Sequence, residues 1–278
     1  MPVKSEINKK SNIHPTAIIS PEARIGENLS IGPYSVIGSD VVIKENTYIG
    51  PHVIIEGKTE IGSNCNLTGA CSIGLPPQDI SYKGENTGVK IGDNTTIREY
   101  VTIHRAVKDG FTTVGSNCFL MNYVHIGHNA QVGNNVIMAN SSMLPGYVIV
   151  ENYVFISGLS TIHQHCRIGE SAMVGAMTGS RLDLPPYFIA DGRPAKIRGV
   201  NKVGLRRRGI KQDVRLELGK AYKLIYLSGL NTTSALEKIE KELVQFPEIK
   251  KLLEFFKNSK RGVVTGLNPD NEYPEDEQ

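Results

Sequence analysis

The sequence predicts an all-β parallel β-helix followed by a small α-helical domain. The main observation is a six-residue repeat that runs from Ile13 to Ile73, resumes at Ile91, and continues without slippage from Val114 to Gly179. Each unit opens with an aliphatic residue, often followed by Gly, and then by turn-forming and small residues. A second observation is that helical periodicity replaces this repeat in the C-terminal part of the chain.

The period of six has a direct structural meaning. It fits neither the 3.6-residue turn of an α-helix nor the simple alternation of a hairpin. It fits a short strand plus a turn, so that every sixth residue points into a common interior. Three units complete one triangular coil, and stacked coils bury a column of Ile, Val and Leu. About 24 units give about eight coils, which at the usual interstrand spacing of ~4.8 Å form a prism on the order of 40 Å long.

The repeat and its breaks divide the 278 residues into segments. We expect a lead-in at 1–12, the β-helix at 13–180, a Pro-rich transition at 181–200, a helical domain at 201–266 and an acidic tail at 267–278. The tail is predicted to be disordered and solvated, because it is rich in acids and has no base.

The helical domain is read from its 3.6-residue pattern and its helix starts. Residues 211–228 place one apolar face inward, formed by Val214, Leu218, Ala221, Leu224 and Ile225. A capping box from Ser234 to Glu237 is expected to open a second helix. Pro247 is expected to begin a third, whose inward residues are Ile249, Leu252, Leu253 and Phe256.

Two interruptions of the repeat predict loops. Twelve surplus residues lie near 75–90 and five near 104–113. A solenoid accommodates insertions only as loops that leave its surface, and such loops often border the functional face. The alternative is that both are excursions without a role.

Composition narrows the class of protein. No stretch approaches the ~18 apolar residues that cross a bilayer, and the start MPVKSEINKK has no apolar signal-peptide core. We therefore expect a cytoplasmic protein without stable membrane insertion. The net charge of +3 and the absence of an aromatic-interleaved basic stripe indicate no nucleic-acid partner. The fifth position of the repeat, otherwise held by small residues, holds all the cysteines, which predicts buried thiols: Cys65, Cys71, Cys118 and Cys166.

Histidines gather on one side of the predicted prism. Residues 18 apart occupy neighbouring coils, so His128 lies beside Gly146, and Gly146 lies beside Gln164. His163 belongs to the adjacent column and His125 lies close by, around a corner. Because none of these histidines occupies the inward aliphatic position, they leave the core. We also expect Gly146 and Gly158 to leave space for a substrate.

Three interpretations of the histidines remain open on this reasoning alone. They are solvated surface groups, ligands of a zinc ion, or a general base in an acyltransferase. A zinc site would need nitrogen atoms of three histidines, each ~2.1 Å from the metal ion. A histidine base has a pKa near neutrality, which suits proton removal from a hydroxyl nucleophile.

Motifs beyond the repeat are HPTAI, PPQDISYKGE, IREYVTIHR, HIGH, TIHQH, LPPYFIADG, GVNKVGLRRRGI and AYKLIYLSG. Through them nearly the whole chain resembles the UDP-N-acetylglucosamine acyltransferases that begin lipid A synthesis. The resemblance implies a left-handed coil and a homotrimer with sites between neighbouring prisms. It implies transfer of a 3-hydroxyacyl group from acyl carrier protein to the sugar 3-position, without a metal or cofactor.

The resemblance also implies residue roles. His128 matches the catalytic base. The residues that match or neighbour substrate-binding positions are Asp79, Ser81, His125, Tyr147, Gly158, His163 and Gln164, and those near the uridine and phosphate end are Asn201, Arg207 and Arg208. Met173 and Ala176 match the acyl-length ruler, and the methyl of Ala176 predicts a shorter acyl chain than glycine would accept. The basic run at 206–208 could instead be solvated charge or dock an acidic carrier protein.

Three matched positions depart from the family pattern. Asn129 stands where an aspartate is common, Ser81 where a lysine is common, and Tyr147 where a histidine is frequent. Asn129 can orient the ring of His128 but cannot supply negative charge to an imidazolium. One explanation is a 3-amino sugar as acceptor, because an amine needs less help from a base; the other is O-acylation with a retuned base. A scaffold that has lost catalysis is the non-enzymatic alternative.

Overall fold

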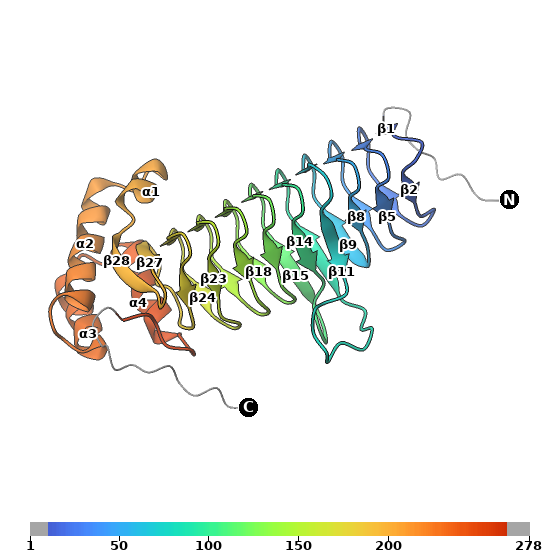
Figure 1. The fold of residues 1–278 in the computed structure, drawn as a ribbon. Coiled ribbons are helices and arrows are strands. Elements are labelled where there is room, and N and C mark those ends of the chain that lie inside the picture. Colours follow the sequence, from blue (N-terminus) through green and yellow to red (C-terminus); the bar gives the residue numbers. More distant parts are fainter. Residues whose placement is uncertain (1–10, 266–278) are drawn as a thin grey trace.

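A three-sided prism dominates the structure (Figure 1). The computed structural model describes residues 11–265, so most of the predicted lead-in and the predicted acidic tail lie outside the described part. Consecutive strands fall in turn on three sheets, and neighbours within each sheet of the prism pair in parallel. The predicted parallel β-helix is confirmed.

The strands of the three sheets are as follows. Sheet A contains β1 (Asn12–Ile13), β4 (Ser30–Ile31), β7 (Tyr48–Ile49), β10 (Asn66–Leu67), β13 (Thr96–Ile97), β16 (Phe119–Leu120), β19 (Ile137–Met138), β22 (Phe155–Ile156), β25 (Met173–Val174), β27 (Phe188–Asp191) and β28 (Lys196–Val200). Sheet B contains β2 (Ile18–Ile19), β5 (Val36–Ile37), β8 (Ile54–Ile55), β11 (Ser72–Leu75), β14 (Thr102–His104), β17 (His125–Ile126), β20 (Met143–Leu144), β23 (Thr161–Ile162) and β26 (Gly179–Ser180). Sheet C contains β3 (Arg24–Ile25), β6 (Val42–Ile43), β9 (Lys58–Ile61), β12 (Gly88–Ile91), β15 (Phe111–Val114), β18 (Gln131–Val132), β21 (Ile149–Val150) and β24 (Arg167–Ile168).

The turns between sheets form three edges of the prism, which we name the AB, BC and CA corners in chain order. In a typical two-residue strand the first side chain faces outward and the second is buried in the common interior. The inward residues of β1 to β3 are only half-buried, because they lie in the first coil, at the N-terminal end of the stack. The aliphatic residue that opens each repeat therefore builds the core.

Strand register locates the insertions. Partners are eighteen residues apart in uninterrupted coils, as in Tyr48 and Asn66, but Asn66 pairs with Thr96 and Thr96 pairs with Phe119. The surplus of twelve residues emerges as a loop at 76–87 and the surplus of five as a loop at 105–110. Both loops leave the prism at the BC corner, between β11 and β12 and between β14 and β15 (Figure 1).

The four cysteines are buried free thiols, as predicted. The thiol of Cys65 lies 3.2 Å from the carbonyl oxygen of Gly92. Hydroxyl groups at the same repeat position bond in the same way, as Ser35 does to the carbonyl of Gly50 at 2.7 Å. Small residues at this position therefore fill the corner and satisfy a backbone acceptor.

The segment after the repeat does more than connect. The predicted transition at 181–200 contains β27 and β28, which form an antiparallel pair, and β27 extends sheet A beyond β25. The reason is that residues 188–191 alternate buried and half-buried side chains, so they continue the sheet although the six-residue repeat has ended.

In the described part of the chain four helices follow, and they lie at the C-terminal end of the prism (Figure 1). They are α1 (Lys202–Arg207), α2 (Gln212–Tyr226), α3 (Thr232–Glu242) and α4 (Pro247–Lys257). Within residues 11–265, none of them combines the length and the apolar composition that a membrane crossing requires.

Helix starts and faces differ in detail from the prediction. The capping box at Ser234 is wrong, because the side chain of Asn231 caps α3 and accepts from the backbone N–H of Ser234 at 2.8 Å. In α4 Phe256 is only half-buried, whereas Phe255 is 2% exposed. Phe255 is covered because the guanidinium of Arg167 lies 4.5 Å from its ring centre.

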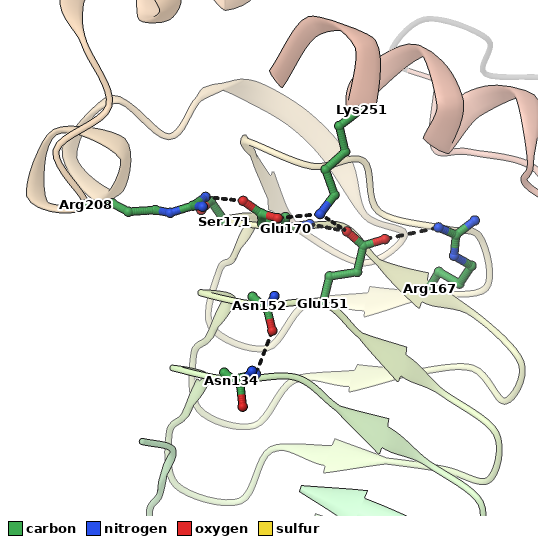
Figure 2. A network of polar contacts seen from close by, with 8 residues as sticks. All are labelled: Asn134, Glu151, Asn152, Arg167, Glu170, Ser171, Arg208 and Lys251. Carbon is green, nitrogen blue, oxygen red and sulfur yellow. Dashed lines mark hydrogen bonds and ion pairs between the residues drawn. The ribbon is translucent and has the colours of Figure 1, made fainter. Parts of the chain in front are cut away.

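A network of charges joins the helices to the last coils at the CA corner (Figure 2). Lys251 of α4 pairs with Glu151 and Glu170, Arg167 pairs with Glu151, and Arg208 pairs with Glu170. Burial alone would raise the pKa of the Glu170 carboxyl, but the hydrogen bond from Lys251 and the charge of Arg208 together lower it. Glu170 is therefore held ionised between two cations.

Candidate active site

The BC corner gathers most of the predicted site around His128. This residue lies in the turn between β17 and β18, and its side chain is 13% exposed. Its Nδ1 lies 3.0 Å from Oδ1 of Asn129, and its Nε2 lies 3.5 Å from a carboxylate oxygen of Asp79. The ring is thus held at both nitrogens, by its neighbour in the chain and by the loop at 76–87.

Gly146 makes room for this ring. A Cβ atom at Gly146 would lie 2.5 Å from both Cε1 and Nε2 of His128. The expectation that Gly146 leaves space for a substrate is therefore wrong, because the imidazole fills that space. The absence of a side chain at Gly146 lets the ring of His128, in the preceding coil, pack against the backbone of the next coil.

Asp79 keeps its charge on the loop. A hydrogen bond from the Ser81 side chain and another from the Ser81 backbone N–H, at 2.8 Å, lower the pKa of the Asp79 carboxyl. The charges of His128 and Lys108 lower it further. Lys108 belongs to the loop at 105–110 and was not among the predicted site residues, because a loop outside the repeat has no register from which to place it.

A pair of histidines, His104 and His125, lies on sheet B near His128. Nδ1 of His125 is 2.8 Å from the hydroxyl of Thr102, and its ring centre is 5.4 Å from that of His104. Burial, with smaller contributions from the charges of His104 and His128, lowers the pKa of His125 to about 4. His125 is therefore neutral at physiological pH.

Sequence reasoning missed His104 as a site residue. Its Nδ1 donates to the carbonyl oxygen of Pro76 at 2.6 Å, and the residue is 9% exposed. Since a carbonyl only accepts, Nδ1 must carry the proton. His104 fastens the first residue of the 76–87 loop to sheet B. The motif IREYVTIHR contains this histidine, so a signal was present in the sequence.

Three other predicted site residues, Tyr147, His163 and Gln164, lie further along the BC corner. The ring of Tyr147 stands edge-on to His128, with centroids 5.3 Å apart, and stacks on His165 at 4.7 Å. His163 and Gln164 line a hollow of about 510 Å³ that also borders Arg181 and Arg193. A hollow bordered by two arginines therefore adjoins the histidine cluster.

Other predicted site residues lie elsewhere on the prism. Gly158 and Ala176 belong to the AB corner, and Met173 lies on sheet A. Asn201 and Arg208 contact Ser171 at the CA corner. A single chain therefore does not bring together the predicted base, the predicted acyl-length ruler and the residues predicted near the phosphate end of the substrate.

The two C-terminal polar residues have structural partners. The side chain of Asn201 caps α1 by accepting from Gly204 at 3.0 Å and donates to the carbonyl of Ser171 at 3.0 Å. The guanidinium of Arg208 lies 4.1 Å from the ring centre of Tyr153 and pairs with Glu170. Arg207 is exposed on α1.

The zinc interpretation finds no ligand set among residues 11–265. No group of three or more His, Cys, Asp or Glu side chains there is arranged to hold a metal ion. The histidines instead bond to threonine, asparagine and backbone oxygens.

Comparison with known proteins places this geometry in a class. Residues 111–146 match the bacterial transferase hexapeptide family, so the prism is that of a hexapeptide-repeat transferase. Residues 183–264 match the family described as UDP N-acetylglucosamine O-acyltransferase, domain 2. The acyl-[acyl-carrier-protein]–UDP-N-acetylglucosamine O-acyltransferase of Thermodesulfovibrio yellowstonii is 52% identical over 255 residues, which cover 91% of this chain and 99% of the relative.

Solved structures agree with the sequence comparison. The UDP-N-acetylglucosamine acyltransferase of Bacteroides fragilis is 41% identical, with a TM-score of 0.88 over 91% of this chain and 99% of that one. The enzyme of Francisella novicida is 34% identical, with a TM-score of 0.87 over 93% and 95%. The chain belongs to the UDP-N-acetylglucosamine O-acyltransferase family, and the predicted left-handed β-helix with C-terminal helices is confirmed.

Proposed function

We propose that this protein transfers a 3-hydroxyacyl chain from acyl carrier protein to the 3-hydroxyl of UDP-N-acetylglucosamine, the first step of lipid A synthesis. The names of its relatives support the reaction. The observation that carries the chemistry is the placement of His128, with an acceptor on Nδ1 and a carboxylate beside Nε2.

The mechanism follows from those two contacts. Oδ1 of Asn129 accepts a hydrogen bond, so Nδ1 of neutral His128 carries the proton and Nε2 is the free base. Nε2 takes the proton of the sugar hydroxyl while the oxygen attacks the thioester carbon. The tetrahedral intermediate expels the carrier thiolate, and the imidazolium returns its proton to that sulfur.

Asp79 supplies what Asn129 lacks. The asparagine cannot offer negative charge to the imidazolium, but the carboxylate of Asp79 lies 3.5 Å from Nε2. A carboxylate at this distance can pair with the imidazolium that forms when Nε2 takes the proton. The change from aspartate to asparagine at 129 is therefore compatible with a hydroxyl acceptor.

We infer that the working form is a homotrimer with sites between prisms. Residues matched to one reaction lie on three different corners of a single chain, and only neighbouring copies could bring these corners together. The AB corner supports this arrangement, because large apolar side chains project from it along the prism. Its exposed members are Tyr34, Tyr100, Tyr123, Leu159 and Met177. An apolar ridge of this length is typical of an interface.

N-acylation of a 3-amino sugar is the second candidate. Asn129 and the exposed Ser81, which stands where the family commonly has a lysine, favour it. Lys108 opposes it, because its charge acts on Asp79 and partly replaces the missing lysine. The cytoplasm is the proposed location, where free thiols such as those of the four buried cysteines are the norm.

His128→Ala tests the proposal. We expect the turnover with 3-hydroxyacyl carrier protein and UDP-N-acetylglucosamine to fall by about 10²- to 10⁴-fold. Mass spectrometry of products from a mixture of the 3-hydroxyl and 3-amino UDP-sugars identifies the acceptor. Faster turnover of the hydroxyl sugar excludes the amine preference, and a wild-type protein inert with every acyl donor would favour the scaffold.

A further inference from the structure

The side chain of Asn129 makes three hydrogen bonds to the backbone of the loop at 105–110. Its Oδ1 accepts from the backbone N–H of Val107 at 2.8 Å, while its Nδ2 donates to the carbonyl oxygens of Val107 and Asp109, both at 3.3 Å. Its own backbone N–H donates to the hydroxyl of Thr112 at 2.8 Å. The side-chain amide thus accepts a hydrogen bond from the N–H of Val107 and donates one to its carbonyl oxygen.

This pairing requires an amide. A carboxylate could still accept from Val107, but its second oxygen would face two carbonyl oxygens that have only lone pairs to offer. Leaving the partly buried carbonyl of Val107 without a donor destabilises the contact. Val107 itself is 1% exposed, so the part of the loop that contacts Asn129 through Val107 is packed against the prism, whereas residues 108–110 are exposed.

The loop also decides which way the amide points. If the amide were flipped, Nδ2 would meet the N–H of Val107, donor against donor. With Oδ1 fixed toward Val107, the same oxygen lies 3.0 Å from Nδ1 of His128. The peptide N–H of Val107 therefore determines, through one oxygen atom, which nitrogen of the His128 ring carries the proton.

The backbone at 129 does not explain the asparagine by itself. Asn129 has φ of 58°, in the left-handed region, and Asn135 at the CA corner has the same conformation, with φ of 57°. Asparagine is favoured at such turns. Asn135 has no side-chain hydrogen bond among the contacts of residues 11–265, whereas the side chain of Asn129 makes four.

We propose that the 105–110 loop is a positioning element that requires an amide at residue 129 and, through it, fixes the tautomer and orientation of His128. The asparagine is then an adaptation to the loop of this chain. Its presence indicates neither a weakened catalytic site nor a change from a hydroxyl to an amine acceptor. The proposal rests on the proposed role of His128 as the base.

Asn129→Asp and Asn129→Gly test the proposal against Asn135→Asp as a matched control. Hydrogen–deuterium exchange of peptides spanning 105–110 should be faster in both Asn129 variants and unchanged in the control. The kcat should fall on the order of 10- to 100-fold with both the hydroxyl and the amino sugar, with KM little changed, which is typical of losing a group that orients a catalytic side chain. Glycine accepts a positive φ, so Asn129→Gly removes the amide without straining the backbone.

Two results would overturn the proposal. The first is an Asn129→Asp protein whose loop stays as protected as in the wild type. The second is an Asn129→Asp protein that turns over the hydroxyl sugar faster than the wild type, because that would make residue 129 a weakened acid. Loop exchange is measured without turnover, so it stays informative if His128→Ala proves active and the base role fails.

Discussion

The BC and CA corners are built from the same repeat and differ in what their side chains bond to. At the CA corner each coil holds the next, since Oδ1 of Asn134 accepts from the N–H of Ser116 and Oδ1 of Asn152 accepts from the N–H of Asn134, both at 2.7 Å. This ladder ends at the charge network of Glu151 and Glu170 (Figure 2). At the BC corner the polar side chains bond to the inserted loops instead.

The difference shows how a solenoid separates stability from chemistry. The buried aliphatic residue of each unit specifies the strands, so the corners are free to vary. A corner whose side chains bind the next coil adds to the stability of the stack. At His128 and Asn129 of the BC corner the side chains do not hydrogen-bond to the next coil. They instead contact each other and the two inserted loops.

The largest expected effect is that of Gly146→Ala, which would make the BC corner resemble an ordinary coil. The new Cβ would overlap the His128 ring, with atoms at 2.5 Å, and displace it from Asn129 and Asp79. Since the value of a positioned base is typically 10²- to 10⁴-fold, we expect kcat to fall about 10³-fold. Steady-state kinetics measures this.

Gly133→Ala is the counterpart at the CA corner. Its Cβ would meet Oδ1 of Asn152 at 2.6 Å and the backbone N of the same residue at 2.9 Å. We expect a loss of about 1–3 kcal/mol in the free energy of unfolding, as for other overpacked sites, with kcat unchanged. If Gly133→Ala lowered kcat as much as Gly146→Ala, the two corners would not have separate roles.

Glu170→Gln is expected to have the next largest effect, on stability alone. It leaves Arg208 without its carboxylate partner and Lys251 with Glu151 alone, beside a side chain that is only 11% exposed. Breaking a buried ion pair by removing one partner costs about 3–5 kcal/mol, and partial exposure places the expected loss near the lower end, at about 3 kcal/mol. Chemical denaturation at a fixed protein concentration measures it.

The pH dependence of stability gives a second test of Glu170. Its pKa in the folded protein is below the ordinary value of 4.5, so the unfolded chain binds more protons in that range. The stabilisation is fully present above pH 4.5 and is lost as the pH falls through the lower, folded value. Glu170→Gln should remove this part of the acid sensitivity. Glu242→Gln is the control, because it breaks an exposed ion pair. It should lower the free energy of unfolding by less than about 0.5 kcal/mol.

The corners also show how far the sequence could predict the site. Counting by eighteen placed His128, Gly146 and Gln164 in one column of three successive coils, because register carries every residue of an unbroken coil to a known column. It could not predict that Asn129 binds Val107, since the surplus residues of a loop have no register. Arg208 lies beyond the repeat, and its pairing with Glu170 depends on how the helices pack on the last coil.

A smaller effect, on substrate binding, is expected at His104, which fastens the loop at 76–87 to sheet B. His104→Ala removes the donor to the carbonyl of Pro76 and loosens the loop that carries Asp79. One hydrogen bond of about 1 kcal/mol corresponds to roughly a fivefold rise in KM for the nucleotide sugar. We expect kcat to change less, because the loosened loop weakens only the contact of His128 with Asp79 and leaves its contact with Asn129 in place.

His104→Asn is the matched variant, because the amide nitrogen of asparagine can occupy the place of Nδ1 and donate to the same carbonyl. Rescue of KM by His104→Asn, with His104→Ala impaired, would show that the hydrogen bond to Pro76 is what matters and not the bulk of the ring. Equal impairment of the two variants would instead assign the effect to the packing of His104 against His125, whose ring centre is 5.4 Å away. In that case the first loop, unlike the loop that binds Asn129, would not owe its position to a hydrogen bond from the prism.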